Sequence, residues 1–371
     1  MDLIHFLFLI LLGFYSLDKV NTIAGGNKNR ISEKENQHCV CVPYWQCKED
    51  YSGLVEDGGE VMDIRMADSD FEIPCSNDFD VCCPVECGKR KNTINDILSE
   101  KIFDGKYFGF RILGNNNEAE FGEFPWMLGI LEGQIYRCGA SLIHPQVAIT
   151  AAHCVSRKGP FNIRAGEWNW KIKSEPLPHQ DQIPKKIIIH PNFHSPSLRN
   201  DIAIIILKSP FKLSENIGLI CLPSQGTQFD MQRCVAAGWG KNSHQKGTYQ
   251  STLKKVDLPI VPRSKCLKTL QEVRLGPYFD LHKSFICAGG EANKDTCKGD
   301  GGSPLMCPIL GRPGKYHQVG IVSWGLTCGL QDTPGVYVNV GLFIEWIDMV
   351  LKVHGFDPTV YKYQRRRRRS V

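Results

Sequence analysis

Sixteen cysteines in 371 residues constrain the folding of this chain more than any other feature. Disulfide bonds persist in oxidising compartments, so a chain this rich in cysteine is expected outside the cytosol. All sixteen can pair, which would leave no free thiol. Zinc binding is the competing interpretation, but the spacings lack the paired C-x-x-C elements of structural zinc sites. The cysteines therefore predict a disulfide framework.

The first residues predict a secretory signal peptide. Residues 3–15 are almost entirely apolar, yet too few to span a bilayer, which takes roughly 18 to 20 residues. We assign residues 1–22 to this peptide and expect cleavage between Ser16 and Ala24. No other apolar stretch is long enough for a membrane helix, so the mature protein is expected to be secreted.

A short front segment, residues 39–83, holds six of the cysteines. So few residues cannot bury a self-sufficient core, and crosslinks must supply the stability. Three disulfides would contribute a few kcal/mol each, roughly, by restricting the unfolded chain. The sequence alone permits about 15 pairings of six cysteines. The chain from residue 112 onward is long enough for one large core, so two modules are predicted.

Three later segments carry chemistry. Residues 150–154 read Thr-Ala-Ala-His-Cys, residues 200–203 read Asn-Asp-Ile-Ala, and residues 297–307 read Cys-Lys-Gly-Asp-Gly-Gly-Ser-Pro-Leu-Met-Cys. In this order they resemble the histidine, aspartate and nucleophile motifs of trypsin-like serine proteases. The resemblance implies an all-β fold, a double Greek-key β-barrel with a C-terminal helix, over residues 112–353.

The same resemblance places a glycine where the attacking serine would stand. In that family the nucleophile follows one disulfide cysteine by four residues and precedes another by six, and Gly301 has both spacings, from Cys297 and Cys307. His153 and Asp201 occupy the other two triad positions. Acyl transfer needs a hydroxyl oxygen, and removing the serine from another serine protease costs about 10⁶-fold in turnover. The sequence predicts a protease fold that does not cut.

Two alternatives stay open. Ser303 could swing in as a relocated nucleophile, although two positions along the chain displace its side chain by several ångströms. His153 and Asp201 could persist only because they pack and hydrogen-bond each other where two barrels meet.

Residue patterns agree with this fold. Residues 126–131, 147–150 and 202–207 are short β-prone runs separated by glycine, proline and polar turns. Apolar residues between Phe343 and Leu351 recur at helical spacing and predict the terminal helix.

The front module resembles a clip domain, the disulfide-knotted module that precedes arthropod trypsin-like domains, because its single cysteines end in an adjacent pair. Residues 39–83 are assigned to it, residues 84–111 to a linker and residues 354–371 to a basic tail. The resemblances imply pairings for seven disulfides and leave two cysteines to join the linker to the protease-like domain. The eight expected pairs are Cys39–Cys82, Cys41–Cys75, Cys47–Cys83, Cys138–Cys154, Cys234–Cys307, Cys266–Cys287, Cys297–Cys328 and, by remainder, Cys87–Cys221.

A specificity pocket is also implied. Asp295 would lie at the base of the pocket that receives Arg or Lys in trypsins, and Gly325 and Gly335 would leave its walls open. Because a buried unpaired carboxylate is costly, Asp295 is expected to face water or a bound cation.

The segment around Arg111 and Ile112 resembles an activation site. Cleavage after Arg111 by an upstream trypsin-like protease would free an Ile112 ammonium to pair with Asp300. A cut elsewhere in the linker or clip domain is the rival interpretation.

Two further sites are expected from residue type. Glu167 and Glu175 fall near the loop that binds calcium in some trypsin-like domains, and carboxylate oxygens suit Ca²⁺; exposed loop acids are the alternative. Tyr44 and Trp45 could line a partner-binding groove in the clip module, or form its small core.

The five arginines from Arg365 to Arg369 carry as much positive charge as the formal net charge of the whole chain, which is +5. This run could contact polyanions such as glycans, or remain a solvated tail. No nucleic-acid-binding fold and no phosphate-binding glycine loop is recognised, and no cofactor is required.

Together the two modules resemble the clip-domain serine protease homologues, similar to the prophenoloxidase-activating factors of insects. The resemblance implies a non-catalytic cofactor in prophenoloxidase activation and melanisation, with prophenoloxidase or phenoloxidase as partner, in haemolymph or venom. The alternatives are a venom or decoy homologue that suppresses melanisation, an active trypsin-like endopeptidase, and adhesion to microbial surfaces.

Overall fold

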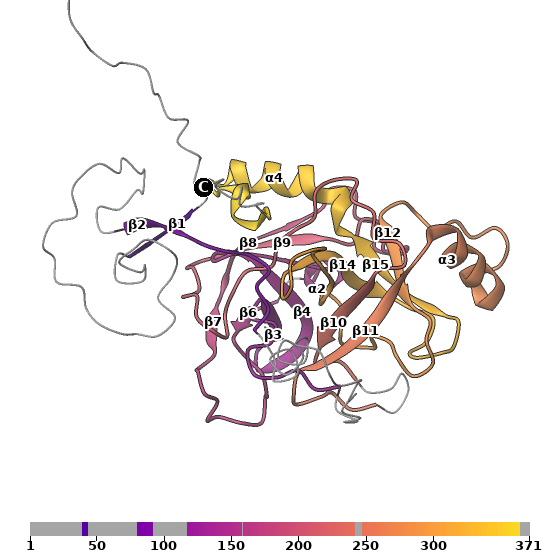
Figure 1. Ribbon diagram of the computed structural model, residues 1–371, viewed down its shortest axis with the longest axis horizontal. Helices are drawn as coiled ribbons and strands as arrows, with labels where there is room; N and C mark the ends of the chain where they lie inside the picture. The colour runs from indigo at the N-terminus through magenta and orange to yellow at the C-terminus, as the bar shows by residue number, and fades with distance from the viewer. Residues whose placement is uncertain (1–38, 44–79, 92–116, 158, 242–246, 364–371) are drawn as a thin grey trace, which may run out of the picture. The chain divides into compact units, whose positions relative to one another are not determined.

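The computed structural model describes residues 39–43, 80–91, 117–157, 159–241 and 247–363 (Figure 1). The predicted signal peptide, most of the clip module with Tyr44 and Trp45, the cleavage site at Arg111 and Ile112, and the arginine run lie outside these residues. Within the described part, no helix has the length and apolar character needed to cross a bilayer.

Strands dominate the described elements. In chain order they are β1 (Cys39–Pro43), β2 (Asp80–Pro84), β3 (Met127–Glu132), β4 (Ile135–His144), β5 (Val147–Thr150), α2 (Ala152–Val155), β6 (Phe161–Ala165), β7 (Gln180–Gln182), β8 (Pro184–Ile189), β9 (Ala203–Leu207), β10 (Arg233–Gly238), β11 (Lys254–Val261), α3 (Arg263–Leu270), the π-helix η2 (Gln271–Leu275), β12 (Phe285–Gly289), β13 (Pro304–Pro308), β14 (Tyr316–Trp324), β15 (Pro334–Asn339), the 3-10 helix η3 (Val340–Phe343), α4 (Ile344–Val353) and the 3-10 helix η4 (Pro358–Tyr361).

The first half of the trypsin-like region is a seven-stranded antiparallel sheet in the order β7-β6-β3-β4-β5-β9-β8. Every residue of β5 and β9 is buried, because these Val-, Ile- and Ala-rich strands are covered on both faces. The predicted run at residues 147–150 coincides with β5, whereas the runs at 126–131 and 202–207 begin one residue before β3 and β9.

The second half closes into a six-stranded barrel in the order β10-β11-β12-β15-β14-β13. Helix α4 follows as predicted and buries one face, formed by Ile344, Ile347, Val350 and Leu351. The all-β, double-barrel prediction is confirmed in outline.

Five disulfides join described cysteines, with the pairings that the sequence led us to expect. They are Cys87–Cys221, Cys138–Cys154, Cys234–Cys307, Cys266–Cys287 and Cys297–Cys328. In the clip module, β1 pairs antiparallel with β2 so that Cys41 lies opposite Cys82. Cys83 is buried and disulfide-bonded. Cys47 and Cys75 lie outside the described residues, and the side chains of Cys39, Cys41 and Cys82 are not described, so the three clip pairings stay predictions.

The predicted basic tail begins too early. Residues 354–363 pack onto the fold: Tyr361 is fully buried, its hydroxyl donates to Asp348, and Leu222 N donates to its carbonyl at 2.9 Å. Burying a tyrosine ring is favourable when the ring packs against apolar neighbours and its hydroxyl finds a hydrogen-bond acceptor.

The start of the predicted linker is likewise part of the domain. Gly88 N donates to Leu219 O at 2.7 Å and Tyr316 N donates to Gly88 O at 2.9 Å, beside the Cys87–Cys221 disulfide. Residues 85–91 are therefore held against the domain, although the sequence assigned all of residues 84–111 to a linker.

Candidate functional site

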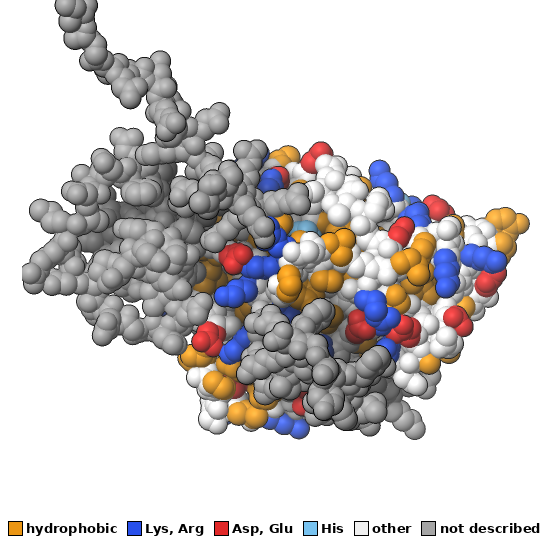
Figure 2. Space-filling view, viewed as in Figure 1, with side chains coloured by type: hydrophobic (Ala, Val, Ile, Leu, Met, Phe, Trp, Pro, Cys, Tyr) orange, Lys and Arg blue, Asp and Glu red, His pale blue; other side chains and the backbone are white. Residues whose placement is uncertain are grey.

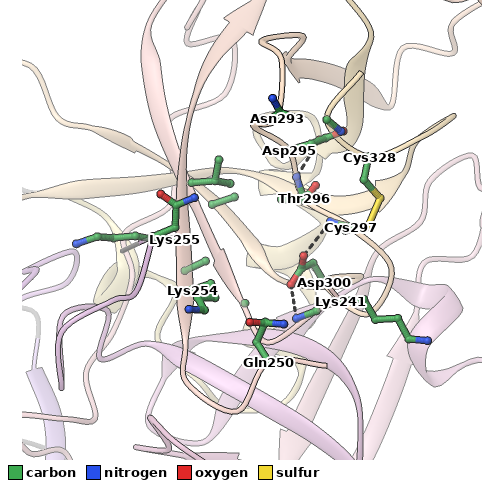
Figure 3. Close-up of a pocket in the computed structure, with 17 residues that line it drawn as sticks. Lys241, Gln250, Lys254, Lys255, Asn293, Asp295, Thr296, Cys297, Asp300 and Cys328 are labelled. Carbon is green, nitrogen blue, oxygen red and sulfur yellow. Dashed lines mark hydrogen bonds between the residues drawn. A yellow bond between two sulfur atoms is a disulfide. The ribbon is translucent and has the colours of Figure 1, made fainter. Parts of the chain in front are cut away.

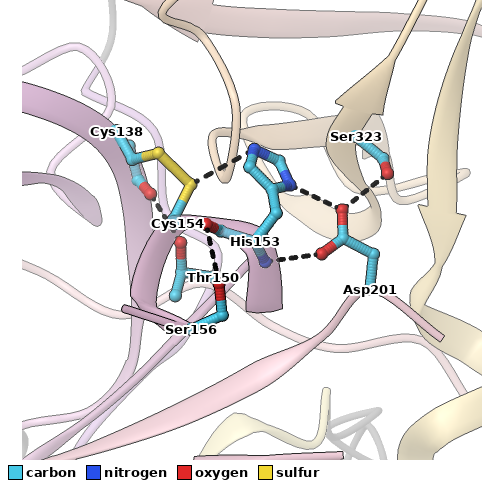
Figure 4. The surroundings of a disulfide bond; sticks show 8 residues. Cys138, Thr150, His153, Cys154, Ser156, Asp201 and Ser323 are labelled. Carbon is cyan, nitrogen blue, oxygen red and sulfur yellow. Dashed lines mark hydrogen bonds and ion pairs between the residues drawn. A yellow bond between two sulfur atoms is a disulfide. The ribbon is translucent and has the colours of Figure 1, made fainter. Parts of the chain in front are cut away.

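A histidine and an aspartate meet as the motifs predict (Figure 4). His153 Nδ1 lies 2.7 Å from Asp201 Oδ2, and His153 N donates to Asp201 Oδ1 at 2.8 Å. Ser323, at the end of β14, donates its hydroxyl to Asp201 Oδ2 at 2.7 Å. Asp201 is fully buried, so this network fixes the ring and turns Nε2 away from the carboxylate.

Local structure explains these positions. His153 lies in the one-turn helix α2, directly after β5, and Thr150 Oγ1 anchors that junction by donating to Gly139 O at 2.8 Å. Asp201 precedes β9 and follows Asn200, whose φ of 55° is left-handed. Asparagine tolerates that conformation better than most residues.

Gly301 lies beneath the imidazole. A Cβ atom built on Gly301 would stand 2.8 Å from His153 Nε2 and 3.7 Å from Cys154 Sγ. The loop is held there because Gly139 N donates to Gly301 O at 2.9 Å and Gly302 N donates to Val322 O at 2.9 Å. Position 301 therefore faces the catalytic-type histidine, and it offers no side-chain oxygen.

Ser303 is not brought to the histidine. It is fully buried, and its hydroxyl packs against Gly139 and Gly238. Its backbone belongs to the chain that enters β13, where Val322 N donates to Ser303 O at 2.9 Å. The alternative of a relocated nucleophile does not fit this geometry.

Asp295 is half-buried. Thr296 N donates to its Oδ1 at 2.8 Å and Gly329 N donates to its Oδ2 at 3.1 Å. Burial raises the pKa of Asp295 to about 7, against the lowering effect of these two bonds. A Cβ on Gly335 would lie 3.1 Å from Oδ1, whereas a Cβ on Gly325 would meet only Thr327 O, at 3.7 Å. Gly325 therefore borders open space, while Gly335 lies against the carboxylate.

A cavity of about 500 Å³ is lined by both Asp295 and Asp300 (Figure 3). Gly240 N donates to Asp300 Oδ1 at 2.8 Å and Cys297 N donates to Oδ2 at 2.9 Å. Gly238 and Gly240 pack so closely on the carboxylate that a side chain at either would collide with it. Part of the residue faces the cavity, yet the carboxyl group is enclosed deeply enough that burial raises its pKa to about 6.

Sequence reasoning missed the buried ion cluster beside this cavity. Glu123, whose side chain is fully buried, accepts from Arg90 Nη2 at 2.6 Å and from Lys255 Nζ at 2.8 Å. Lys255 also lines the cavity. An isolated glutamate in a turn has no sequence signal, because its partners come from residues more than thirty positions before and over a hundred after it.

Glu167 and Glu175 approach each other in one loop. Glu175 Oε1 accepts from Asn169 N at 2.7 Å, and Arg164 Nη1 donates to Glu167 Oε2 at 3.1 Å. Glu167 Oε1 and Glu175 Oε2 are buried with no hydrogen-bond partner among the described residues. Burial and the neighbouring Glu167 charge raise the pKa of Glu175. Glu167 is buried and Glu175 is half-buried, so the alternative of exposed loop acids is wrong for Glu167. Carboxylate oxygens are the ligand type that Ca²⁺ prefers.

Charges on the visible surface are mixed. In Figure 2, Lys and Arg side chains alternate with Asp and Glu side chains over the described part of the face shown. Opposite charges also pair directly, as Arg233 does with both Asp257 and Glu291. The described part of this face carries no field of a single sign.

Comparison with known families matches this architecture. The family described as Trypsin matches residues 113–347, and the family described as Serine protease Clip domain PPAF-2 matches residues 28–84. The chain belongs to the trypsin family, in its clip-domain branch.

Relatives of this clip-domain protein point the same way. Phenoloxidase-activating factor 2 of Galleria mellonella is 48% identical over 271 residues, which are 69% of this chain and 89% of the relative. Inactive CLIP domain-containing serine protease A8 of Anopheles gambiae is 36% identical over 86% of this chain and 91% of its own. Inactive CLIP domain-containing serine protease A3 of Aedes aegypti is 36% identical over 85% of this chain and 68% of its own.

Proposed function

We propose that this clip-domain protein is a secreted, non-catalytic cofactor that binds proteins of the prophenoloxidase system and promotes melanisation. The observation that carries the proposal is the glycine at position 301, directly beneath His153 Nε2. Two of the relatives above are named inactive, and another is named a phenoloxidase-activating factor.

The chemical argument is independent of those names. The His153–Asp201 pair can accept a proton, but no described hydroxyl stands at Gly301 to give one. What remains of catalysis without a nucleophile is too small for a protease's task, about 10³- to 10⁴-fold over water. The protein therefore acts through its surfaces.

Cleavage after Arg111 is the proposed trigger. The new Ile112 ammonium would enter the 500 Å³ cavity and pair with Asp300. Among the described residues, no cationic side chain pairs with this enclosed carboxylate. An upstream trypsin-like protease is the cutting partner. Because Cys87 is bonded to Cys221, the clip module stays attached after the cut.

The proposed role of Asp295 is to hold a basic side chain that the protein binds without cutting. Burial raises the pKa of Asp295 to about 7, so the carboxyl group is partly protonated at neutral pH. A bound cation would favour the ionised form. Titration calorimetry with benzamidine should show binding that Asp295→Asn removes, while the exposed Asp230→Asn variant binds normally.

Calcium is proposed for the Glu167 and Glu175 loop. Glu167 Oε1 and Glu175 Oε2 would bind the ion, which would give these two oxygens the partner that they lack among the described residues.

The decisive experiment combines purified protein, prophenoloxidase and its activating protease. Protein cut after Arg111 should raise phenoloxidase activity, whereas Arg111→Ala should stay uncut and inactive as a cofactor. Suppression of melanisation would instead identify the decoy function. Hydrolysis of a chromogenic arginine substrate, or a fluorophosphonate adduct on residues 297–307, would refute the non-catalytic assignment.

A further inference from the structure

The Cys138–Cys154 disulfide lies beside His153, the histidine that faces Gly301. A ring nitrogen of His153 and the two sulfur atoms all lie within 4.8 Å of one another. His153 Nε2 is 3.6 Å from Cys154 Sγ (Figure 4). Among the described residues, no hydrogen-bond donor lies beside Nε2, because the sulfur of a disulfide carries no proton, and Cys154 Sγ is the atom that this nitrogen contacts.

The imidazole is held ready to take a proton. Asp201 is fully buried and lies 2.7 Å from Nδ1, so Nδ1 carries the ring proton and Nε2 is left as the acceptor. The same carboxylate stabilises the imidazolium that forms when Nε2 is protonated.

Glycine at 301 leaves the sulfur uncovered on this side. A Cβ there would lie against both groups, 2.8 Å from Nε2 and 3.7 Å from Cys154 Sγ. Cys154 is half-buried and His153 keeps 30% of its side chain exposed, whereas Cys138 is only 8% exposed. A small molecule that reaches Nε2 therefore meets Cys154 before Cys138.

We propose that Cys138–Cys154 is a thiol–disulfide exchange site, at which His153 acts as general base for an incoming small thiol. The thiol gives its proton to Nε2, and its sulfur attacks Cys154 Sγ while the bond to Cys138 breaks. Cys138 leaves as a thiolate and takes the proton back from the imidazolium. The products are a mixed disulfide on Cys154 and a free Cys138 thiol, and no further oxidant or reductant is consumed.

This inference goes beyond the proposed cofactor role and does not depend on it. The modification would untie α2, which carries His153, from β4, which carries Cys138. It would act on the protein's surface near the former catalytic position, and it needs only a thiol of the glutathione class.

The experiment uses the full uncut protein under native conditions with reduced glutathione. Free and glutathionylated cysteines are trapped by alkylation over time and quantified by peptide mass spectrometry. The matched internal control is Cys266–Cys287, which closes a similar loop, 21 residues against 16, but has both cysteines buried. Cys138–Cys154 should exchange at least about tenfold faster, with glutathione on Cys154.

Variants separate general-base action from mere exposure. His153→Gln should slow exchange at Cys138–Cys154 by about tenfold and remove the part of the rate that persists near neutral pH, where little glutathione is thiolate. His194→Gln, at an exposed histidine, should change the exchange rate of neither Cys138–Cys154 nor Cys266–Cys287. Gly301→Ala should also slow exchange, because its methyl group would crowd both Nε2 and Cys154 Sγ, where the incoming thiol must fit.

Three results would overturn the proposal. They are equal exchange at Cys138–Cys154 and Cys266–Cys287, an unchanged rate and pH profile in His153→Gln at unaltered melting temperature, or glutathione found on Cys138 in place of Cys154.

Discussion

Replacing Asp300 by asparagine should affect the uncut and the cut protein in opposite directions. In the uncut chain, enclosure raises the pKa of this carboxyl from 3.8 to about 6. The protonated Asp300 carboxyl group therefore contributes to the free energy of unfolding. This contribution is fully present below pH 3.8 and is lost as the pH rises through about 6. The loss is about 3 kcal/mol in full, at most, and about 1.4 kcal/mol of it falls between pH 5 and pH 8.

The asparagine of the Asp300→Asn variant carries no charge at any of these pH values. It cannot accept from both Gly240 N and Cys297 N, which costs about 1 to 2 kcal/mol regardless of pH. The pH-dependent part is therefore diagnostic: relative to the wild type, the Asp300→Asn variant should gain about 1.4 kcal/mol in unfolding free energy between pH 5 and pH 8. Once the chain is cut, an Ile112 ammonium beside Asp300 would reverse this trend.

Urea unfolding of wild type and Asp300→Asn at the two pH values measures the effect. The uncut state is locked by Arg111→Ala, and Asp230→Asn at an exposed position serves as control. A difference between wild type and Asp300→Asn that is the same at pH 5 and pH 8 in the uncut state would refute the burial argument. The same sign in cut and uncut protein would refute the pairing with Ile112.

Three further predictions follow from the same geometry. Gly301→Ser should leave hydrolysis of a chromogenic arginine substrate at least about 100-fold below that of a trypsin-like protease, because a Cβ would lie 2.8 Å from His153 Nε2 and the ring must retreat; turnover at protease level would contradict this. Glu123→Gln should lower the unfolding free energy by about 3 kcal/mol, since Arg90 and Lys255 lose a buried anion; chemical denaturation measures it, and a change below about 1 kcal/mol would show that the cluster relaxes into water. Added Ca²⁺ should raise the melting temperature of the wild type but not of Glu175→Gln, with Glu132→Gln as the exposed control; an equal rise in all three would place the ion elsewhere.

Much of the architecture was predictable because the signals are local or depend on spacing. The strand at residues 147–150 follows from a short β-prone run, and the helix Ile344–Val353 follows from apolar residues at helical spacing. The placement of Gly301 beneath His153 follows from its spacing to Cys297 and Cys307, which the described disulfides hold to Cys328 and Cys234.

Other features needed the tertiary structure because their partners are distant in sequence. Residues 354–363 looked like the start of a tail, yet Tyr361 is buried where Leu222 and Asp348 receive it. Glu123 stands alone in sequence, and only the fold brings Arg90 and Lys255 to its carboxylate.

The sequence by itself determined the residue types: a glycine in the nucleophile register, a histidine and an aspartate in their motifs, and cysteines enough to crosslink the fold. The tertiary structure decided what each of them faces. It enclosed the Asp300 carboxyl group beside a cavity and turned His153 Nε2 toward Cys154 Sγ, because desolvation and direct contact depend on neighbours that only folding supplies.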